Sequence, residues 1–224
     1  MTETSRHIVW DWNGTLLDDG HLMIESIIAA FSGAGYEGVT IAEHQRQFRR
    51  PISEFFERLA RKSLDEDELN DLLERFDSAY ARGEHGAMLT HDAHRCLAAW
   101  RRDGDTQSLL SMCPHEKLEP LVRKMGIADH FTLVEGRVGQ GPDTKGSYLR
   151  RHIRRLGISD LGSVLLIGDT IDDAMAAREA GVKCIIYHSG ATALHRRDHF
   201  DSRGVPVVSS LSAAVETASR LFPA

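Results

Sequence analysis

Acidic side chains follow an apolar run near the start of the chain. Residues Ile8–Trp10 are apolar, Asp11 comes directly after them, and Asn13-Gly14 follows. An apolar run bounded by a turn signal predicts a short buried strand, and Asn-Gly predicts the turn. Open α/β sheets bind ligands at the carboxyl ends of their strands. We therefore expect the Asp11 carboxylate to face a ligand site.

A second apolar run, Ser163–Ile167, ends in the same way but with more carboxylates. The residues that follow are Gly168-Asp169-Thr170-Ile171-Asp172-Asp173. A helix rich in small residues is predicted at Asp173–Ala180, ending at Gly181. Asp169-Thr170 is also a typical helix-capping pair. A ligand site and a helix cap are both open interpretations of this segment.

Two further residues stand at element ends between these motifs. Ser111 lies near the end of a strand predicted at Asp105–Met112, and Lys145 opens a helix predicted at Lys145–Leu156. A hydroxyl at a strand end is often structural, and a lysine at a helix start is often solvated. The segment Gly141-Pro142-Asp143-Thr144 before Lys145 does not decide between these interpretations.

In chain order, these four segments resemble the four motifs of the haloacid dehalogenase (HAD) superfamily. Asp11-Trp12-Asn13-Gly14-Thr15 resembles its Asp-x-Asp-Gly-Thr signature, and the segment beginning at Gly168 resembles its Gly-Asp-Thr-x-x-Asp motif. The pattern is similar to the phosphoglycolate phosphatase-like branch, which carries a helical cap. The resemblance implies an enzyme: a Mg²⁺-dependent hydrolase of a small phosphomonoester that forms an aspartyl-phosphate on Asp11.

The resemblance also implies a role for each site residue. The metal ligands would be Asp11, the backbone carbonyl of Asn13, and Asp169, while Asp173 would hold water on the metal or orient Lys145. Ser111 and Lys145 would bind the phosphoryl group and assist catalysis, the lysine as a point cation. Thr15 and Met112 are expected beside the substrate. The adjacent Asp172 leaves open which of Asp172 and Asp173 serves the metal site.

Asn13 departs from the family pattern, in which a second Asp protonates the leaving group. An amide can donate a hydrogen bond but cannot exchange a proton in this way. General acid–base catalysis contributes about 10²–10⁴ in rate, so hydrolysis of alkyl phosphates is expected to be slow. Good leaving groups, such as aryl or acyl phosphates, would suffer less. Four alternatives remain open: a phosphatase with a replacement acid, a weak or specialised phosphatase, a non-hydrolytic phosphate-binding or regulatory protein, and a phosphotransferase or mutase.

A helical segment separates the first motif from the others. Apolar spacing predicts helices at His21–Phe31, from an N-cap at Ser53, and at Asp65–Tyr80. We expect a helical cap domain at residues 19–87 and a core domain formed by residues 1–18 and 88–224. Arg49 and Arg50 lie between cap helices, where either could bind a second anionic group of the substrate. They could equally be solvated.

The core is expected to be a Rossmann-like, doubly wound parallel α/β sheet, because strands and helices alternate along it. The additional strands are predicted at Phe131–Val134, Lys183–Tyr187 and Val205–Val208, and further helices at Glu116–Met125 and Leu211–Leu221.

Composition limits the partners of the chain. The 224 residues carry a formal charge of −6, which argues against a nucleic-acid or anionic-membrane partner. The partner that the family resemblance implies is a small phosphorylated metabolite. No apolar run approaches the roughly 18 residues of a membrane span, and the first residues do not resemble a secretion signal. Three widely spaced cysteines favour a reduced, cytoplasmic protein.

Overall fold

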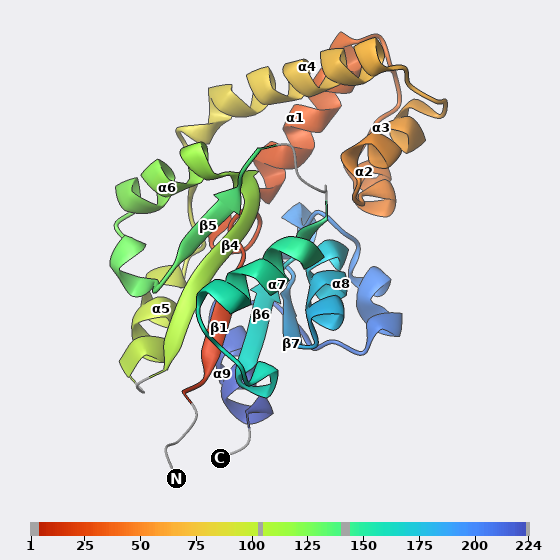
Figure 1. The fold of residues 1–224 in the computed structure, drawn as a ribbon. Coiled ribbons are helices and arrows are strands. Elements are labelled where there is room, and N and C mark those ends of the chain that lie inside the picture. Colours follow the sequence, from red (N-terminus) through yellow and green to blue (C-terminus); the bar gives the residue numbers. More distant parts are fainter. Residues whose placement is uncertain (1–4, 103–104, 140–143, 223–224) are drawn as a thin grey trace.

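A parallel sheet forms the centre of the molecule (Figure 1). The computed structural model describes residues 5–102, 105–139 and 144–222; the first four residues and Gly141-Pro142-Asp143, which the sequence analysis considered, lie outside them. Six strands pair in the order β5-β4-β1-β6-β7-β8, all parallel. The strands are β1 (His7–Trp10), β4 (Thr106–Pro114), β5 (Val134–Arg137), β6 (Val164–Gly168), β7 (Lys183–Tyr187) and β8 (Val207–Val208).

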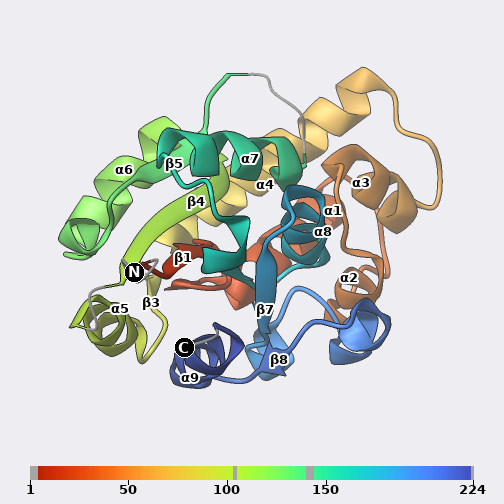
Figure 2. The ribbon, with the colours of Figure 1, turned by 60° about the horizontal axis from the view of Figure 1, so that its bottom comes forward.

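Helices cover both faces of this sheet, because side chains alternate between the faces along each strand. Val9 packs on one side with α7 (Lys145–Arg155) and α8 (Ile171–Ala180). Its neighbours Ile8 and Trp10 pack on the other side with α5 (Ala93–Arg102), α6 (His115–Lys124) and α9 (Leu211–Leu221). Figure 2 shows α7 and α9 on opposite sides of the strands. Short 3-10 helices occur at Ala128–His130, Leu161–Ser163, Gly190–Thr192 and Arg197–Arg203. The predicted fold class is confirmed.

A helical insertion rises above the carboxyl end of β1 (Figure 1). It comprises α1 (Gly20–Gly33), α2 (Ile41–Gln47), α3 (Ile52–Ala60) and α4 (Glu66–Glu84), with α1 packed along α4. Its own apolar core includes Phe31, Phe55 and Phe56. The strands β2 (Leu17–Asp18) and β3 (Met88–Leu89) pair antiparallel at its base. The insertion therefore leaves and re-enters the sheet region at one place, close to the predicted limits of residues 19–87, and its division from the core as a separate domain stays a prediction.

Several predicted boundaries were wrong. The strand expected at Phe131–Val134 begins only at Val134, because it is an edge strand that contains polar residues and a glycine, and the apolar run mainly leads into it. Ser53 does not cap a helix: α3 begins at Ile52 after Pro51, whose ring fixes a backbone angle suited to a helix start. The helix α8 begins two residues before Asp173, at Ile171. The sequence analysis also did not assign α5.

Candidate active site

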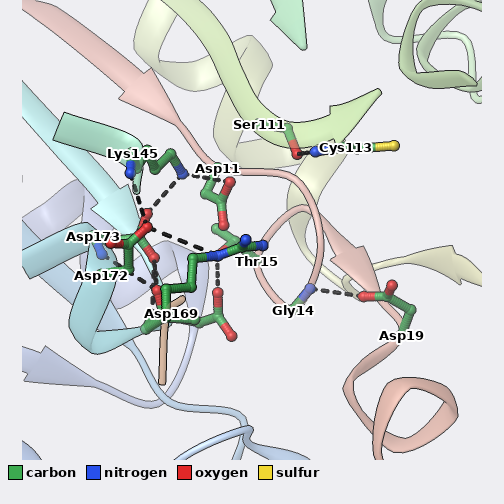
Figure 3. A network of polar contacts seen from close by, with 12 residues as sticks. Asp11, Gly14, Thr15, Asp19, Ser111, Cys113, Lys145, Asp169, Asp172 and Asp173 are labelled. Atoms are coloured by element: carbon green, nitrogen blue, oxygen red, sulfur yellow. Dashed lines mark hydrogen bonds and ion pairs between the residues drawn. The ribbon is translucent and has the colours of Figure 1, made fainter. Parts of the chain in front are cut away.

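Asp11 and Lys145 form an ion pair at the carboxyl end of the sheet. Asp11 follows β1, and Lys145 is the first residue of α7. The Lys145 Nζ lies 2.5 Å from Oδ1 of Asp11 and 2.6 Å from Oδ1 of Asp173 (Figure 3). All three side chains are buried. The two strand-end motifs and the lysine, which are far apart in the sequence, therefore meet at one point.

Asp173 uses its two carboxylate oxygens for different contacts. Its Oδ2 accepts hydrogen bonds from the backbone N–H of Thr170 at 3.0 Å and from the Thr170 hydroxyl at 2.6 Å, while its Oδ1 faces Lys145. Thr170 in turn accepts from the backbone N–H of Asp173, which completes a capping box. The helix-cap interpretation thus holds for Thr170 and Asp173 without removing Asp173 from the site.

The loop after Asp11 lies directly against Asp169. Gly14 has a φ of +71°, and a Cβ at this position would lie 2.3 Å from Oδ2 of Asp169. Only glycine tolerates both the conformation and the contact. The Thr15 hydroxyl donates to Oδ1 of Asp169 at 3.2 Å. Thr15 is fully buried and contacts this carboxylate, and it is not among the residues that line the adjacent pocket.

The three clustered carboxylates differ in the direction in which their pKa is shifted: it is raised for Asp11 and Asp169 and lowered for Asp173. Burial raises the pKa of Asp11 to about 7, although the Lys145 ammonium opposes this shift. Burial also raises the pKa of Asp169 well above its usual range, and the charges of Asp11 and Asp173 add to the effect. For Asp173, the penalty of burial is outweighed by Lys145 and Thr170, so its pKa is lowered. Burial alone would lower the pKa of Lys145, but the charges of Asp11 and Asp173 raise it by a larger amount, so Lys145 stays charged. Among the three, Asp169 is thus the carboxylate whose burial is least offset by positive charge and hydrogen bonds.

The donor set suits a hard divalent cation. Asp11, Asp169 and Asp173 each offer a carboxylate oxygen, and these atoms lie within 4.8 Å of one another. Among the described residues, this is the only such group of His, Cys, Asp and Glu side chains. Lys145 is the one cation that contacts these three carboxylates within the described part of the chain, so the ionised carboxylates leave an excess of negative charge in a buried place. Mg²⁺ prefers oxygen ligands of this type, so the residues fit the expected metal.

A pocket of about 200 Å³ opens beside Asp11. Ser111, Met112 and Lys145 line it together with Asn13. Ser111 is 2% exposed, and its Oγ accepts a hydrogen bond from the backbone N–H of Cys113 at 3.0 Å (Figure 3). The Ser111 hydroxyl therefore lies at the same edge of the sheet as Asp11, as its position near the end of a strand predicted.

The two cap arginines have different surroundings. Arg50 lines the pocket, and its Nε lies 3.9 Å from Oδ2 of Asp172. Arg49 instead donates to the backbone carbonyl of Gln47 at 3.1 Å and lies 3.5 Å from Glu54. The same Oδ2 of Asp172 accepts a hydrogen bond from the backbone N–H of Lys145 at 3.1 Å. Asp172 therefore joins the cap to the start of α7, whereas Asp173 belongs to the carboxylate cluster.

A family model described as haloacid dehalogenase-like hydrolase matches residues 6–181. The chain belongs to this family. The predicted resemblance is thus confirmed, and this HAD-like hydrolase is an enzyme of that class.

The chain is also similar to proteins named phosphoglycolate phosphatase. The HAD-like chain is 27% identical over 187 residues to a phosphoglycolate phosphatase of Yersinia pseudotuberculosis, covering 80% of this chain and 79% of the relative. It is 26% identical over 227 residues to one of Mesorhizobium japonicum, covering 97% and 96%.

Solved structures share the fold. A structure described as a predicted phosphatase from Clostridium acetobutylicum has a TM-score of 0.81 at 15% identity, covering 97% of this chain and 100% of that one. A haloacid dehalogenase-like family protein from Streptococcus pneumoniae has a TM-score of 0.77 at 16% identity, covering 95% and 98%. Among the described residues, no helix combines the length and apolar character needed to cross a membrane.

In this HAD-like hydrolase, the exceptional Asn13 is tied to two residues that the sequence analysis did not single out. Its Nδ2 donates to Oδ2 of Asp19 at 2.6 Å and to the Tyr80 hydroxyl at 3.2 Å. The Tyr80 hydroxyl also donates to Oδ2 of Asp19 at 2.6 Å, and the backbone N–H of Gly14 donates to Oδ1 at 2.7 Å. Asp19 is fully buried, and burial raises its pKa despite these hydrogen bonds. The position of Asp19 six residues after Asn13 was visible in the sequence, whereas Tyr80 was indistinguishable from the apolar stripe of its helix.

Proposed function

We propose that this protein is a Mg²⁺-dependent phosphatase that hydrolyses a small phosphomonoester through a phosphorylated Asp11. The observation that carries the proposal is the position of Asp11: it lies beside a pocket, in contact with a buried lysine and within 4.8 Å of two further carboxylates. The phosphoglycolate phosphatase names of the relatives support a phosphomonoester as substrate. The three free cysteines favour the cytoplasm as the place of action.

The residues present would divide the reaction into two displacements. An oxygen of Asp11 forms a bond to phosphorus while the ester P–O bond breaks, and the leaving oxygen takes a proton from solvent. Water then attacks the phosphorus, which releases inorganic phosphate and regenerates the Asp11 carboxylate. Lys145 holds Asp11 in place and neutralises charge on the phosphoryl oxygens. Ser111, which lines the pocket, would donate a hydrogen bond to one of these oxygens.

Asp11, Asp169 and the backbone carbonyl of Asn13 would hold Mg²⁺, which supplies positive charge where the anionic phosphate meets the Asp11 carboxylate. Asp173 and Thr15 would support this set. Asp173 anchors Lys145, and Thr15 orients Asp169 through its hydroxyl. The sequence analysis considered four further residues as substrate contacts: Thr15, Arg49, Arg50 and Met112. Arg50 and Met112 line the pocket, and this proposal retains them as substrate contacts. Thr15 and Arg49 do not line the pocket, and the proposal gives them no contact with the substrate.

Asn13 favours one competing function, a phosphate-binding protein that does not turn over. A phosphotransferase or mutase is the other alternative, and release of phosphate into water distinguishes it from a hydrolase. The test is phosphate release from para-nitrophenyl phosphate and a panel of sugar and acid phosphates, with Mg²⁺ and with EDTA.

Metal-dependent release that disappears in Asp11→Asn is the expected result. Arg49→Gln is the matched control, because this side chain lies outside the pocket lining, and it should retain activity. Binding of Mg²⁺ and inorganic phosphate without turnover on any substrate would overturn the hydrolase in favour of the binding protein.

A further inference from the structure

One wall of the pocket beside Asp11 is formed by apolar side chains that stay partly exposed. Phe76 and Tyr80 are one helical turn apart on α4, so they share a face of that helix, and their ring centroids are 5.8 Å apart. Met23 of α1 and Met112 of β4 line the same pocket. Phe76, Met23 and Met112 are all partly exposed. Apolar side chains left open in a concave site are typical of a site for an apolar ligand.

Charges of both signs line this pocket, Arg50 and Lys117 as well as the carboxylates of α4, and only the α4 side is purely acidic. Asp77 and Glu84 lie on the face of α4 that carries Phe76 and Tyr80, and both line the pocket. Arg50 is already close to Asp172. A carboxylate carried by the substrate would meet like charge along α4, whereas an uncharged body would not.

The polar groups next to Asp11 offer little help to a leaving oxygen. The Asn13 amide donates to Asp19 and Tyr80, and the Tyr80 hydroxyl donates to Asp19. The residue that replaces the family acid is thus directed to a buried carboxylate. An alkoxide, whose conjugate acid is about as weak as water with a pKa near 15.7, would have to leave without that residue's proton. A phenolate, with a conjugate acid of pKa about 10, departs far more easily.

We propose that the substrate class is the aryl phosphomonoester: a phosphorylated phenol whose ring occupies the wall formed by Met23, Phe76, Tyr80 and Met112. This inference rests on the proposed phosphatase function and names its substrate. An Asp11 oxygen bonds to phosphorus, the aryl P–O bond breaks, and the phenolate leaves with the bonding electron pair and takes its proton from solvent. Water hydrolyses the aspartyl-phosphate as described above.

The experiment compares three substrates with the Mg²⁺-loaded protein. Phenyl phosphate has an aromatic body and a good leaving group. Benzyl phosphate has a similar body and an alkyl leaving group. Glycerol phosphate has neither feature. We expect kcat/KM for phenyl phosphate to exceed that for benzyl phosphate by about 10² or more, the scale of a missing general acid. Benzyl phosphate should bind with a lower KM than glycerol phosphate.

Pocket variants test the wall separately from the leaving group. Phe76→Ala and Met112→Ala should raise KM for phenyl phosphate several-fold with little change for glycerol phosphate. Ile41→Ala removes an exposed apolar side chain elsewhere in the cap and should change neither. Thermal unfolding of each variant verifies that the fold is retained.

Two outcomes would overturn the inference. Equal turnover of benzyl and phenyl phosphate would mean that another group supplies the proton. Unchanged KM for phenyl phosphate in both pocket variants would mean that the wall does not bind an aryl group. Failure of the proposed function looks different, since no substrate would then release phosphate in an Asp11-dependent way.

Discussion

The Nδ2 of Asn13 lies 2.6 Å from Oδ2 of Asp19, so the residue that departs from the family motif is hydrogen-bonded to a buried acid. The pair consists of one amide and one carboxyl group. It provides complementary donor and acceptor atoms, which two carboxylates at this distance could not do without sharing a proton. Position 13 and position 19 must therefore be considered together.

Restoring the family residue alone should destabilise the protein at high pH. In Asn13→Asp, a half-buried carboxyl group and the buried Asp19 share one proton, which raises the pKa of the pair above that of the unfolded chain. Stability is then present at low pH and lost as the pH rises through the raised pKa. We expect a loss of roughly 3 kcal/mol at pH 8 relative to the wild type, and a smaller one at pH 5. Urea unfolding at both pH values measures it.

The exchange variant Asn13→Asp/Asp19→Asn is the matched control for that effect. It keeps one amide and one carboxyl group, so most of the lost stability should return. It also places a carboxyl group where the family acid stands, and hydrolysis of alkyl phosphates should rise by about 10². If Asn13→Asp were as stable as wild type at pH 8, positions 13 and 19 would not be in contact.

Lys145 should matter for stability as well as for activity. Lys145→Gln leaves Asp11 and Asp173 buried without their cation, and removal of one partner of a buried ion pair costs about 3–5 kcal/mol. Because a divalent cation would supply charge at the same carboxylates, added Mg²⁺ should recover part of the loss. Urea unfolding with EDTA and with Mg²⁺ measures both effects. The exposed Lys124→Gln serves as control, and equal stability of the two variants would contradict the prediction.

Two tyrosines allow a direct test of the hydrogen bond between α4 and the start of α1. Tyr80→Phe removes the donor to Asp19, a bond to a charged group worth about 1.5–3 kcal/mol. Tyr148 is a matched control, because its buried hydroxyl has no hydrogen-bond partner among the described residues. Tyr148→Phe should be neutral or stabilising. Urea unfolding should separate the two, and hydrogen exchange should show faster opening of α4 only in Tyr80→Phe.

A buried histidine in the cap should make the protein acid-sensitive. His44 stacks on Phe48 at a ring-centroid distance of 5.3 Å and meets the edge of Phe55 at 5.1 Å. Burial lowers its pKa to about 4, below the unfolded value of about 6.5. The stabilising effect of the neutral ring is complete above pH 6.5 and is lost as the pH falls towards 4.

The corresponding measurement is urea unfolding at pH 7 and pH 5. For His44, the linkage amounts to up to about 2 kcal/mol at pH 5, and His44→Phe should show a correspondingly smaller drop than wild type. His94→Phe, at an exposed position, should retain the wild-type slope. A slope unchanged in His44→Phe would show that another group causes the acid sensitivity.

The sequence was a good guide where one physical signal dominated. Fully buried central strands consist of consecutive apolar residues, so the strand at Lys183–Tyr187 was found at its observed bounds, and that at Val164–Gly168 within one residue. The edge strand was misplaced because Glu135 lies within it: this carboxylate is buried and is bonded by His152 at 2.6 Å. A buried polar pair of this kind has no local sequence pattern.

Within the site, motif order was enough to bring Asp11, Lys145 and Asp173 together, because strand ends meet at one edge of a parallel sheet. It did not reveal Tyr80, which lies 61 residues from its partner Asp19 and resembles its apolar helical neighbours in type. It also could not distinguish Arg49 from Arg50. These adjacent residues have the same chemistry, and only the path of the loop into α3 decides which one lines the pocket.

The short pairing of β2 with β3 brings the two ends of the inserted helices next to each other. Because these two ends lie side by side, a different segment could be grafted between Asp18 and Met88 in place of the insertion without moving the sheet. Tyr80 belongs to the inserted helices, whereas its hydrogen-bond partner Asn13 lies in the loop after β1. A graft that omits Tyr80 leaves the Asn13 amide short of one partner, so residue 13 has to be chosen together with any segment that replaces the insertion.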